Sequence, residues 1–438
     1  MKKIKLFALV AYFVVSPTNV FSQVIEHDND SKNNESVVVT SSSTDNIPEL
    51  FEGMDAAGES ALEKWASAHY IISDTGCHHS NTNPTFTDQE YIDRLQRLQT
   101  VMEMTYNPVV RRYIDLYMGR LRRSVSFMLA ASNFYVPIFE EALDRYGLPL
   151  ELKYLPVIES ALMPTAKSHA GAAGLWQFMI GTARRYGLDQ SSLIDDRLDP
   201  IKSSDAAARY LRDLYKIYGD WNLVIAAYNC GPTNVEKAIS RAGGTRDYWA
   251  IYPYLPRETR GYVPGFIAAN YAMTYYCEHN ICPMQSTLPQ ATDTLHVNRD
   301  LYFEQIADIC HVSLDMLRDL NPQYLTNLIP GNAQTCVVRL PLGAITAFID
   351  AKDGIYTYNL ESLQTHRPTV EVDEKAAAPA KTTTRRTTTR TTSSKAKGKK
   401  ATAKVSKRQA NKRQATSKKT STKKKAATKK TASKKKRR

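Results

Sequence analysis

Amphipathic helical patterns separated by Gly and Pro dominate the chain from residue 88 to about residue 285. Apolar side chains such as Tyr91, Leu95 and Leu98 recur three or four positions apart, which is the spacing of one face of an α-helix. Gly147 stands where one such pattern stops, as is typical of residues that end helices. No alternating pattern of the kind that predicts strands interrupts this stretch. We therefore expect a mainly α-helical domain.

One helix in this stretch has clear signals at both ends. The string "SSDAAARYLRDLYKIYGD" begins with Ser203, Ser204 and Asp205, residue types that cap helix N-termini, and stops at Gly219. The sequence predicts that capping by these three residues opens the helix.

A smaller unit of mixed structure follows the helical stretch. Residues 295–341 contain two short helical patterns and then "CVVRLP", which is rich in β-forming residues. We expect a small α+β module of βααβ order over residues 293–342.

The two ends of the chain have the composition of segments outside a packed core. Lys2, Lys3 and Lys5 precede an apolar run that is too short to cross a bilayer, and Ser22 suits a cleavage site. Residues 1–22 are therefore predicted to be a signal peptide, and the polar stretch 23–85 is predicted to be a mostly disordered linker.

The basic character of the chain belongs to its C-terminal tail. Of 58 Lys and Arg residues, 26 lie between Lys375 and Arg438, where there is no Asp, Glu or aromatic residue. The rest of the chain carries 32 basic and 44 acidic residues and is net acidic. Residues 370–438 are expected to be disordered, because like charges repel and nothing apolar is available to bury. Such a tail binds polyanions without sequence specificity, or it serves as a solvated spacer.

Six cysteines in a chain with an export signal permit disulfides. Cys277 could pair with Cys282, and Cys310 with Cys336, but spacing alone does not give connectivity, and free buried thiols are an equal alternative. No C-x-x-C or H-x₃₋₅-H spacing accompanies them, so we expect no metal site.

Four short stretches in the helical region carry the candidate chemistry. Each is weak alone, but together and in this order they are specific: "IESAL" (158–162), "GLWQF" (174–178), "AYNCG" (227–231) and "ETRGYV" (258–263). The chain resembles the lytic transglycosylases with a goose-lysozyme-like fold over about residues 90–285. The resemblance implies a lysozyme-like catalytic domain over 148–285, with residues 86–147 forming a helical region that packs against it.

Glu159 is the candidate acid. Cleavage of a β-1,4 glycoside needs a protonated carboxyl at the leaving oxygen, and the apolar run before Glu159 would raise its pKa by desolvation. A conventional hydrolase also needs a second carboxylate, yet residues 160–178 contain no Asp or Glu. Asp189, Asp195 and Asp196 come next, in a segment that the sequence does not place.

The resemblance implies that no second carboxylate is needed. In the family, the 6-hydroxyl of the sugar itself attacks and gives 1,6-anhydromuramoyl ends, with one Glu acting as acid and then as base. By motif match, the substrate-binding residues are Ser160, Gln177, Tyr228, Asn229, Glu258 and Tyr262. Pairing of Glu258 with Arg257 or Arg260 is an alternative to a direct role, and Trp176 is either a core residue or a sugar platform.

The module at 293–342 resembles a LysM domain, which implies binding of glycans that contain N-acetylglucosamine. The matching strings are "IADICHVSLDMLRDLNP" and "IPGNAQTCVVRLP", but "NRDLYFE" replaces the usual Gly-Asp-Thr. Binding to the cell wall and a purely packing role are both open.

Together these observations predict an exported peptidoglycan lytic transglycosylase of the periplasm or cell envelope, without metal or cofactor. Its partners would be peptidoglycan strands and, through the tail, anionic envelope polymers or a membrane surface, with no specific nucleic acid. The alternatives are a hydrolytic muramidase of the same fold and a non-catalytic peptidoglycan-binding scaffold.

Overall fold

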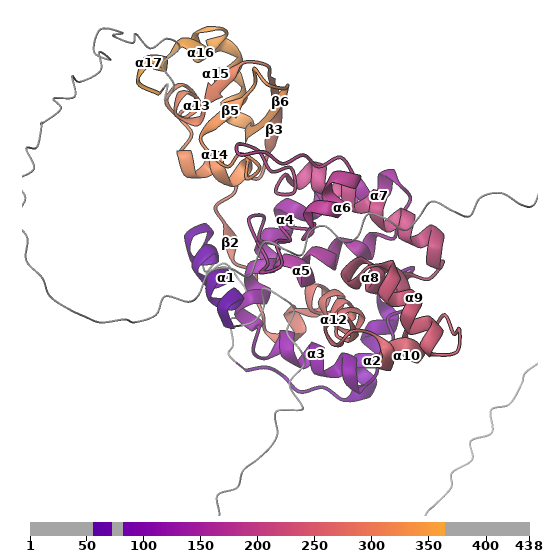
Figure 1. The fold of residues 1–438 in the computed structure, drawn as a ribbon. Helices are drawn as coiled ribbons and strands as arrows, with labels where there is room; N and C mark the ends of the chain where they lie inside the picture. Colours follow the sequence, from indigo (N-terminus) through magenta and orange to yellow (C-terminus); the bar gives the residue numbers. More distant parts are fainter. Residues whose placement is uncertain (1–55, 72–81, 364–438) are drawn as a thin grey trace, which may run out of the picture. The chain divides into compact units, whose positions relative to one another are not determined.

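The computed structural model describes residues 56–71 and 82–363 (Figure 1). The expected signal peptide, most of the linker and the basic tail lie outside these residues. The helices before residue 285 are α1 (Ala56–His69), α2 (Asp88–Arg97), α3 (Pro108–Met118), α4 (Arg122–Arg145), α5 (Leu155–Ser160), α6 (Ile180–Arg185), α7 (Pro200–Tyr218), α8 (Trp221–Cys230), α9 (Pro232–Arg241), α10 (Tyr248–Ile251), α11 (Arg257–Arg260) and α12 (Tyr262–Tyr275). Short 3-10 turns lie at Leu150–Tyr154, Tyr252–Tyr254 and Cys277–His279.

Helix α12 is the centre of this helical region. Its residues from Tyr262 to Met273 are buried on every side, as expected of a helix that is apolar all round. It packs against α3, α5 and α8, and Figure 1 shows it among these helices. The expected mainly helical domain is confirmed.

The linker predicted over 23–85 is wrong for its last part. Residues 56–69 form α1, which buries Leu62 and Ala66 in the main core and packs against α4. The spacing of Leu62, Trp65 and Ala66 gives the helix one apolar side. The prediction missed this short pattern because it relied on the polar composition of residues 23–85 as a whole.

The predicted start of the helix before Gly219 is also wrong by one turn. Asp199 is the N-cap of α7, since its carboxylate accepts hydrogen bonds from the N–H groups of Ile201 and Lys202. Ser203 and Ser204 lie inside the helix and are buried. The predicted end is correct, because Gly219 has the positive φ of 64° that favours glycine.

The expected α+β module is present. Its elements are β3 (Thr292–Val297), β4 (Asp300–Tyr302), α13 (Phe303–Cys310), α14 (Leu314–Leu320), β5 (Leu328–Pro330), β6 (Cys336–Pro341), α15 (Leu342–Ala351), α16 (Gly354–Thr357) and α17 (Leu360–Leu363). Strand β3 pairs antiparallel with β6, and β4 pairs antiparallel with β5. A separate two-residue pair joins β1 (Tyr70–Ile71) to β2 (Gln285–Ser286).

The module extends beyond the predicted boundary at residue 342. Phe348 of α15 and Ile355 of α16 are buried in the core formed by the strands and α13. Hydrophobic content fades only after Asp350, and these apolar residues hold α15 and α16 on the small core.

Neither disulfide considered from the sequence is formed. Cys277, Cys310 and Cys336 are free thiols, as is Cys230. Cys282 is disulfide-bonded, but not to any of these four. Burial raises the pKa of the Cys310 thiol to about 11, so it remains protonated near neutral pH.

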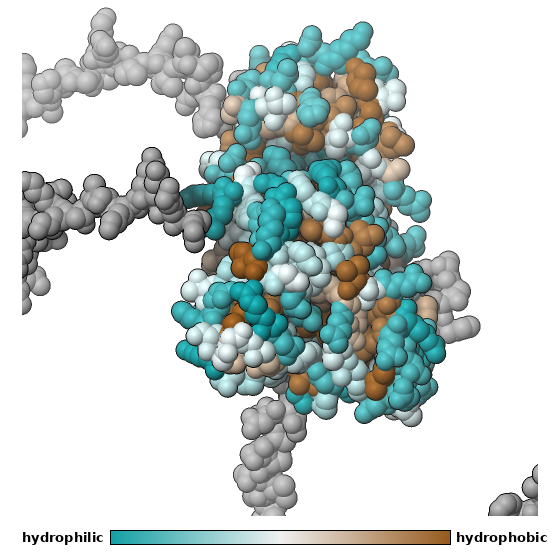
Figure 2. Space-filling model, turned by 90° about the vertical axis from the view of Figure 1, so that its right-hand side faces the viewer, coloured by the Kyte–Doolittle hydropathy of each residue, from teal (hydrophilic) through white to brown (hydrophobic). Residues whose placement is uncertain are grey.

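Across the described residues, no helix combines the length and the apolar character that crossing a membrane requires. On the face shown in Figure 2, apolar side chains are interspersed with hydrophilic ones.

Candidate active site

Glu159 projects from the last turn of α5. The residues before it, Leu155 to Ile158, are buried, and so is Ser160, whereas Glu159 itself is only partly exposed. The helix ends because Ala161 takes a left-handed conformation, with φ 49°. The apolar surroundings predicted for the acid are therefore present on its own helix.

Tyr262 is the direct partner of Glu159. It is the first residue of α12, and its buried hydroxyl donates a hydrogen bond to the Glu159 carboxylate. The two residues are 103 positions apart in the chain and are brought together because α5 packs against α12. A hydrogen-bond donor on a carboxylate fixes its direction in the site.

The segment 166–178, which we call the site segment, makes tight turns beside α5. Gly171 and Gly174 have φ of 88° and 85°, and Gln177 has φ of 45°. A Cβ on Gly174 would lie 1.9 Å from the backbone oxygen of Arg197, so only glycine fits there. The amide of Gln177 donates to the carbonyl of Gly174 at 2.8 Å, which holds this partly exposed side chain in place.

Ser160 and Trp176 connect α5 and the site segment to the core. The hydroxyl of Ser160 is buried and lies 2.9 Å from the carbonyl oxygen of Leu175, to which it donates. This contact ties the end of α5 to the site segment. Trp176 is fully buried and donates to the Ser204 hydroxyl at 2.9 Å. Of the two roles considered for Trp176, the structure gives the core role.

Tyr228 and Asn229 lie at the end of α8. The Tyr228 hydroxyl donates to the carbonyl of Trp176 at 2.8 Å. Burial, and after it the negative charge of Glu159, raise the pKa of Tyr228 well above its usual value, so it remains a neutral donor. Asn229 is exposed and accepts a hydrogen bond from the hydroxyl of Thr259 at 2.8 Å.

Glu258 lies in the short helix α11 and is exposed. The expected alternative of pairing with Arg260 is not formed, because the Arg260 guanidinium donates to the carbonyls of Leu255 and Pro253. Thr259, which the sequence did not single out, is buried and connects α11 to Asn229.

Of the three acids that the sequence could not place, Asp195 and Asp196 bind basic side chains, and Asp189 is exposed. Asp195 forms a buried, two-point ion pair with Arg197, at 2.9 and 2.7 Å. Asp196 accepts from Lys202 at 2.9 Å and from the N–H of Asp189. No cluster of His, Cys, Asp or Glu suited to a metal ion occurs in residues 56–71 and 82–363.

Sequence reasoning missed Arg197. Its Nη1 donates to the carbonyls of Gly171 (2.8 Å) and Phe178 (3.1 Å), so it holds both ends of the turns in the site segment. The string "DDR" is a weak signal that a buried arginine needs a nearby acid, but its carbonyl partners come only from the fold.

Comparison with known proteins agrees with this geometry. Residues 137–251 match the sequence model of the transglycosylase SLT domain. We call residues 137–251 the SLT domain after this match. Residues 291–357 match the LysM-like domain of the lytic transglycosylase MltD, in agreement with the module's extension past residue 342. The SLT match contains Glu159, Gln177 and Tyr228, and it ends before Glu258 and Tyr262.

Curated relatives match the same region. Membrane-bound lytic murein transglycosylase D of Escherichia coli strain K12 is 29% identical over 290 residues, which are 65% of this chain and 62% of the relative. The chain thus spans about three-fifths of that relative's length. The soluble lytic murein transglycosylase of the same strain is 34% identical over 124 residues, 27% of this chain and 19% of the relative.

One solved structure is similar in part. The crystal structure of the 70 kDa soluble lytic transglycosylase from Escherichia coli is 29% identical, with a TM-score of 0.29, over 35% of this chain and 26% of that chain.

Proposed function

We propose that the chain is an exported peptidoglycan lytic transglycosylase. Its substrate is the β-1,4 bond between N-acetylmuramic acid and N-acetylglucosamine, and its products carry 1,6-anhydromuramoyl ends. The observation that carries this proposal is Glu159, placed at the end of an apolar helix, oriented by Tyr262 and located within an SLT domain. The lytic murein transglycosylases among the relatives support the substrate class.

Glu159 acts twice in the proposed reaction. As a carboxylic acid it gives its proton to the glycosidic oxygen, and the bond from that oxygen to the anomeric carbon breaks. The 6-hydroxyl of the muramoyl sugar then attacks the anomeric carbon, and the Glu159 carboxylate takes the hydroxyl proton. No water is consumed, and no second carboxylate is required.

The partly exposed or exposed polar groups of the site are the proposed substrate contacts. The NH2 of Gln177 donates to the carbonyls of Ala166 and Gly174, so its amide oxygen is the group proposed to contact the glycan. Asn229 at the end of α8 and Glu258 in α11 offer exposed polar groups. Tyr228 and Tyr262 bound the site, but their hydroxyls already donate to the Trp176 carbonyl and to the Glu159 carboxylate, so toward a glycan each can only accept. Ser160 was expected to contact glycan, but its hydroxyl is occupied by backbone carbonyls, so its support for the proposal is indirect.

The remaining proposals concern binding and location. The LysM-like module is proposed to bind peptidoglycan, and the basic tail to bind anionic envelope polymers or a membrane surface. We propose the periplasm or cell envelope as the location. Pull-down of the full chain with insoluble peptidoglycan across a salt series tests the binding roles, since contacts by the tail weaken steeply with salt.

The decisive experiment combines one substitution with one mass measurement. Purified peptidoglycan is digested with the wild-type chain and with Glu159→Gln, and the released muropeptides are weighed. The wild type should release anhydro products, which are lighter by one water than hydrolytic products. Glu159→Gln should lower the rate about 10²- to 10⁴-fold, the usual contribution of a general acid.

Glu141→Gln is the matched control. Glu141 is an exposed glutamate on α4 that pairs with Arg145 on the same helix, so its amide variant should digest at the wild-type rate. Products heavier by one water would instead identify the hydrolytic muramidase. A wild type that binds peptidoglycan without releasing fragments would identify the scaffold.

A further inference from the structure

The loop of residues 191–199, which we call the junction loop, belongs to the SLT domain but pairs with the LysM-like module. The N–H of Asp195 donates to the carbonyl of Gln323 at 2.9 Å. In the opposite direction, the N–H of Leu325 donates to the carbonyl of Leu193 at 2.9 Å. The two stretches therefore pair as a short antiparallel ladder, which fixes the backbone of the loop.

Ile194, in the middle of this ladder, is part of the module's hydrophobic core. Its side chain is buried there with residues such as Val297, Ile306 and Ile329, and not in the core of the SLT domain. A small core buries too little apolar surface to spare a member, so the module and the junction loop stabilise each other.

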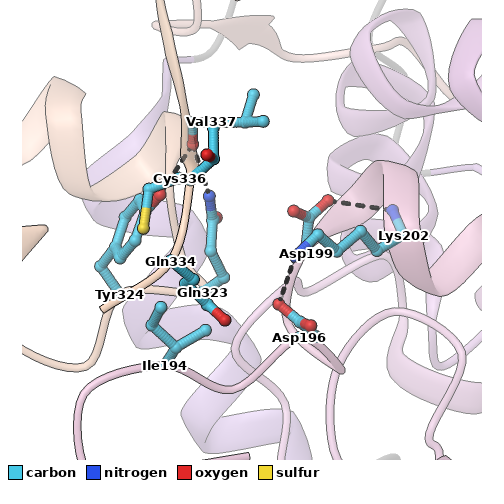
Figure 3. A pocket seen from close by; sticks show the side chains of 10 residues that line it. Ile194, Asp196, Asp199, Lys202, Gln323, Tyr324, Gln334, Cys336 and Val337 are labelled. Atoms are coloured by element: carbon cyan, nitrogen blue, oxygen red, sulfur yellow. Dashed lines mark hydrogen bonds and ion pairs between the residues drawn. The ribbon is translucent and has the colours of Figure 1, made fainter. Parts of the chain in front are cut away.

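Beside the ladder, Asp196, Lys202 and Tyr324 hydrogen-bond within their own domains, and the buried Oε1 of Gln323 has no hydrogen-bond partner. Figure 3 shows Asp196 and Lys202 of the SLT domain opposite Gln323 and Tyr324 of the module, around one small pocket. Asp196 is bound by Lys202, and the Tyr324 hydroxyl donates to the module's own Val337 carbonyl. The ladder and Ile194 therefore account for the attachment of the loop at this point.

The other end of the junction loop holds the site segment. Arg197 is 7% exposed, and its guanidinium contacts Asp195, Gly171 and Phe178. Its backbone oxygen lies directly against Gly174. A buried arginine is strongly constrained by such partners, because losing any of them leaves a charged donor unsatisfied away from water.

The site segment in turn holds the groups around the acid. The carbonyl of Leu175 accepts from Ser160, the neighbour of Glu159, and the carbonyl of Trp176 accepts from Tyr228. Hydrogen bonds, joined by short stretches of backbone, thus link Gln323 to the helix that carries the proposed acid.

We propose that the LysM-like module is a structural brace of the active site, and that Arg197 is the positioning residue through which the module acts. The expected effect on kcat rests on the proposed function, whereas the expected effect on the order of the site segment does not. The module then has a role in turnover that is separate from any binding of glycan.

The first test compares two arginines that donate to backbone carbonyls, the buried Arg197 and the partly buried Arg122. Arg197→Lys keeps the charge but cannot reach an acid and two carbonyls together, because a lysine has a single ammonium group. It should lower kcat on soluble peptidoglycan fragments of defined length about tenfold, with KM changed less than threefold. Arg122→Lys is the control: Arg122 also donates to backbone carbonyls, those of Met118, His279 and Asn280, and its variant should keep the wild-type kcat.

The second test compares two isoleucines of the same module core. Ile194→Ala should lower kcat about threefold, whereas Ile329→Ala, an equal truncation on β5, should leave kcat unchanged at temperatures where the module is folded. The double variant of Ile194→Ala and Arg197→Lys should be no slower than Arg197→Lys alone, because both changes act through one path.

Hydrogen exchange separates failure of the brace from failure of the proposed function. The Phe178 N–H, which donates to the Ala173 carbonyl, should exchange at least fivefold faster in Ile194→Ala and in Arg197→Lys than in the wild type, with α2 amides unchanged. This readout needs no catalysis, so it decides the brace even if the wild type cleaves nothing. Unchanged Phe178 exchange in both variants, or kinetic effects that multiply in the double variant, would overturn the brace.

Discussion

The two hydrophobic cores of this chain are built differently. The SLT region and its flanking helices form one large core, in which α12 is buried on every side and no member comes from the module. The module's core is much smaller, holds no disulfide although Cys310 and Cys336 lie in it, and includes Ile194 from the SLT domain. The large core draws all its members from the SLT domain and its flanking segments, whereas the module's core includes one residue from outside the module.

This difference indicates where each region is vulnerable. Apolar burial scales with the size of a domain, so the large core tolerates a polar, strained site within it. The small core depends on single side chains and on one borrowed residue. Changes to the SLT domain should therefore act first through backbone strain at the site, and changes to the module through lost packing.

The largest expected effect is at Gly174. Gly174→Ala should lower the free energy of unfolding by about 3–6 kcal/mol, because a Cβ collides with the Arg197 carbonyl and φ is positive. Gly171→Ala has the same sign of φ but no atom within 4 Å, so it should cost only about 1–2 kcal/mol. Urea denaturation of both variants checks this, and equal losses would contradict the close contact.

The next effect is in the module. Ile329→Ala should destabilise the module by about 2–5 kcal/mol, since Ile329 is fully buried in a core with few members. Ile349→Ala, on the exposed side of α15, should change stability by less than about 0.5 kcal/mol. If thermal unfolding followed by circular dichroism shows the two variants to be alike, the module core is not the one described.

Acid should weaken the large core through His279. Burial, and after it the charge of Arg94, lowers the His279 pKa to about 4. His279 therefore binds a proton near pH 6.5 in the unfolded chain but only near pH 4 in the folded chain. Between these pH values the free energy of unfolding falls as the pH falls, by up to about 3 kcal/mol. His279→Gln should flatten this part of the stability profile, and an unchanged slope would exclude His279 as its source.

The smallest expected effect is the contribution of the contact between His69 of α1 and Asp319 of α14 to the free energy of unfolding. Its dependence on pH is opposite to that of His279. The hydrogen bond that His69 Nε2 donates to the Asp319 carboxylate, at 2.9 Å, raises the pKa of His69. This contribution is fully present below about pH 6.5 and is lost as the pH rises through the raised folded pKa. It should be under about 1 kcal/mol, because the pair is partly exposed. The free energies of unfolding of the wild type and of Asp319→Asn, compared across a pH series, measure this contribution. A difference that grows as the pH rises would contradict the role given to His69.

Local sequence predicted the features that depend on local physics. The end of α7 at Gly219 was predictable because glycine readily adopts the positive φ found there. The strand "CVVRLP" was predictable from its β-forming residues. Glu159 could be proposed as the acid because a buried apolar run precedes it directly in the chain. The wrong start of α7 arose because Asp199 and the two serines are all good caps, and only the tertiary fold decides between them.

The partners of these residues followed only from the tertiary structure. Nothing local to Tyr262 points to Glu159, and nothing local to Arg197 points to the carbonyls of Gly171 and Phe178, because each contact joins segments that pack together only in the folded chain. The amino-acid sequence by itself determined the mainly helical domain, the module and the position of the proposed acid. Only the tertiary structure decided which groups orient the proposed acid and in which core Ile194 is buried. Burial and long-range hydrogen bonds are properties of the packed molecule and not of any one segment.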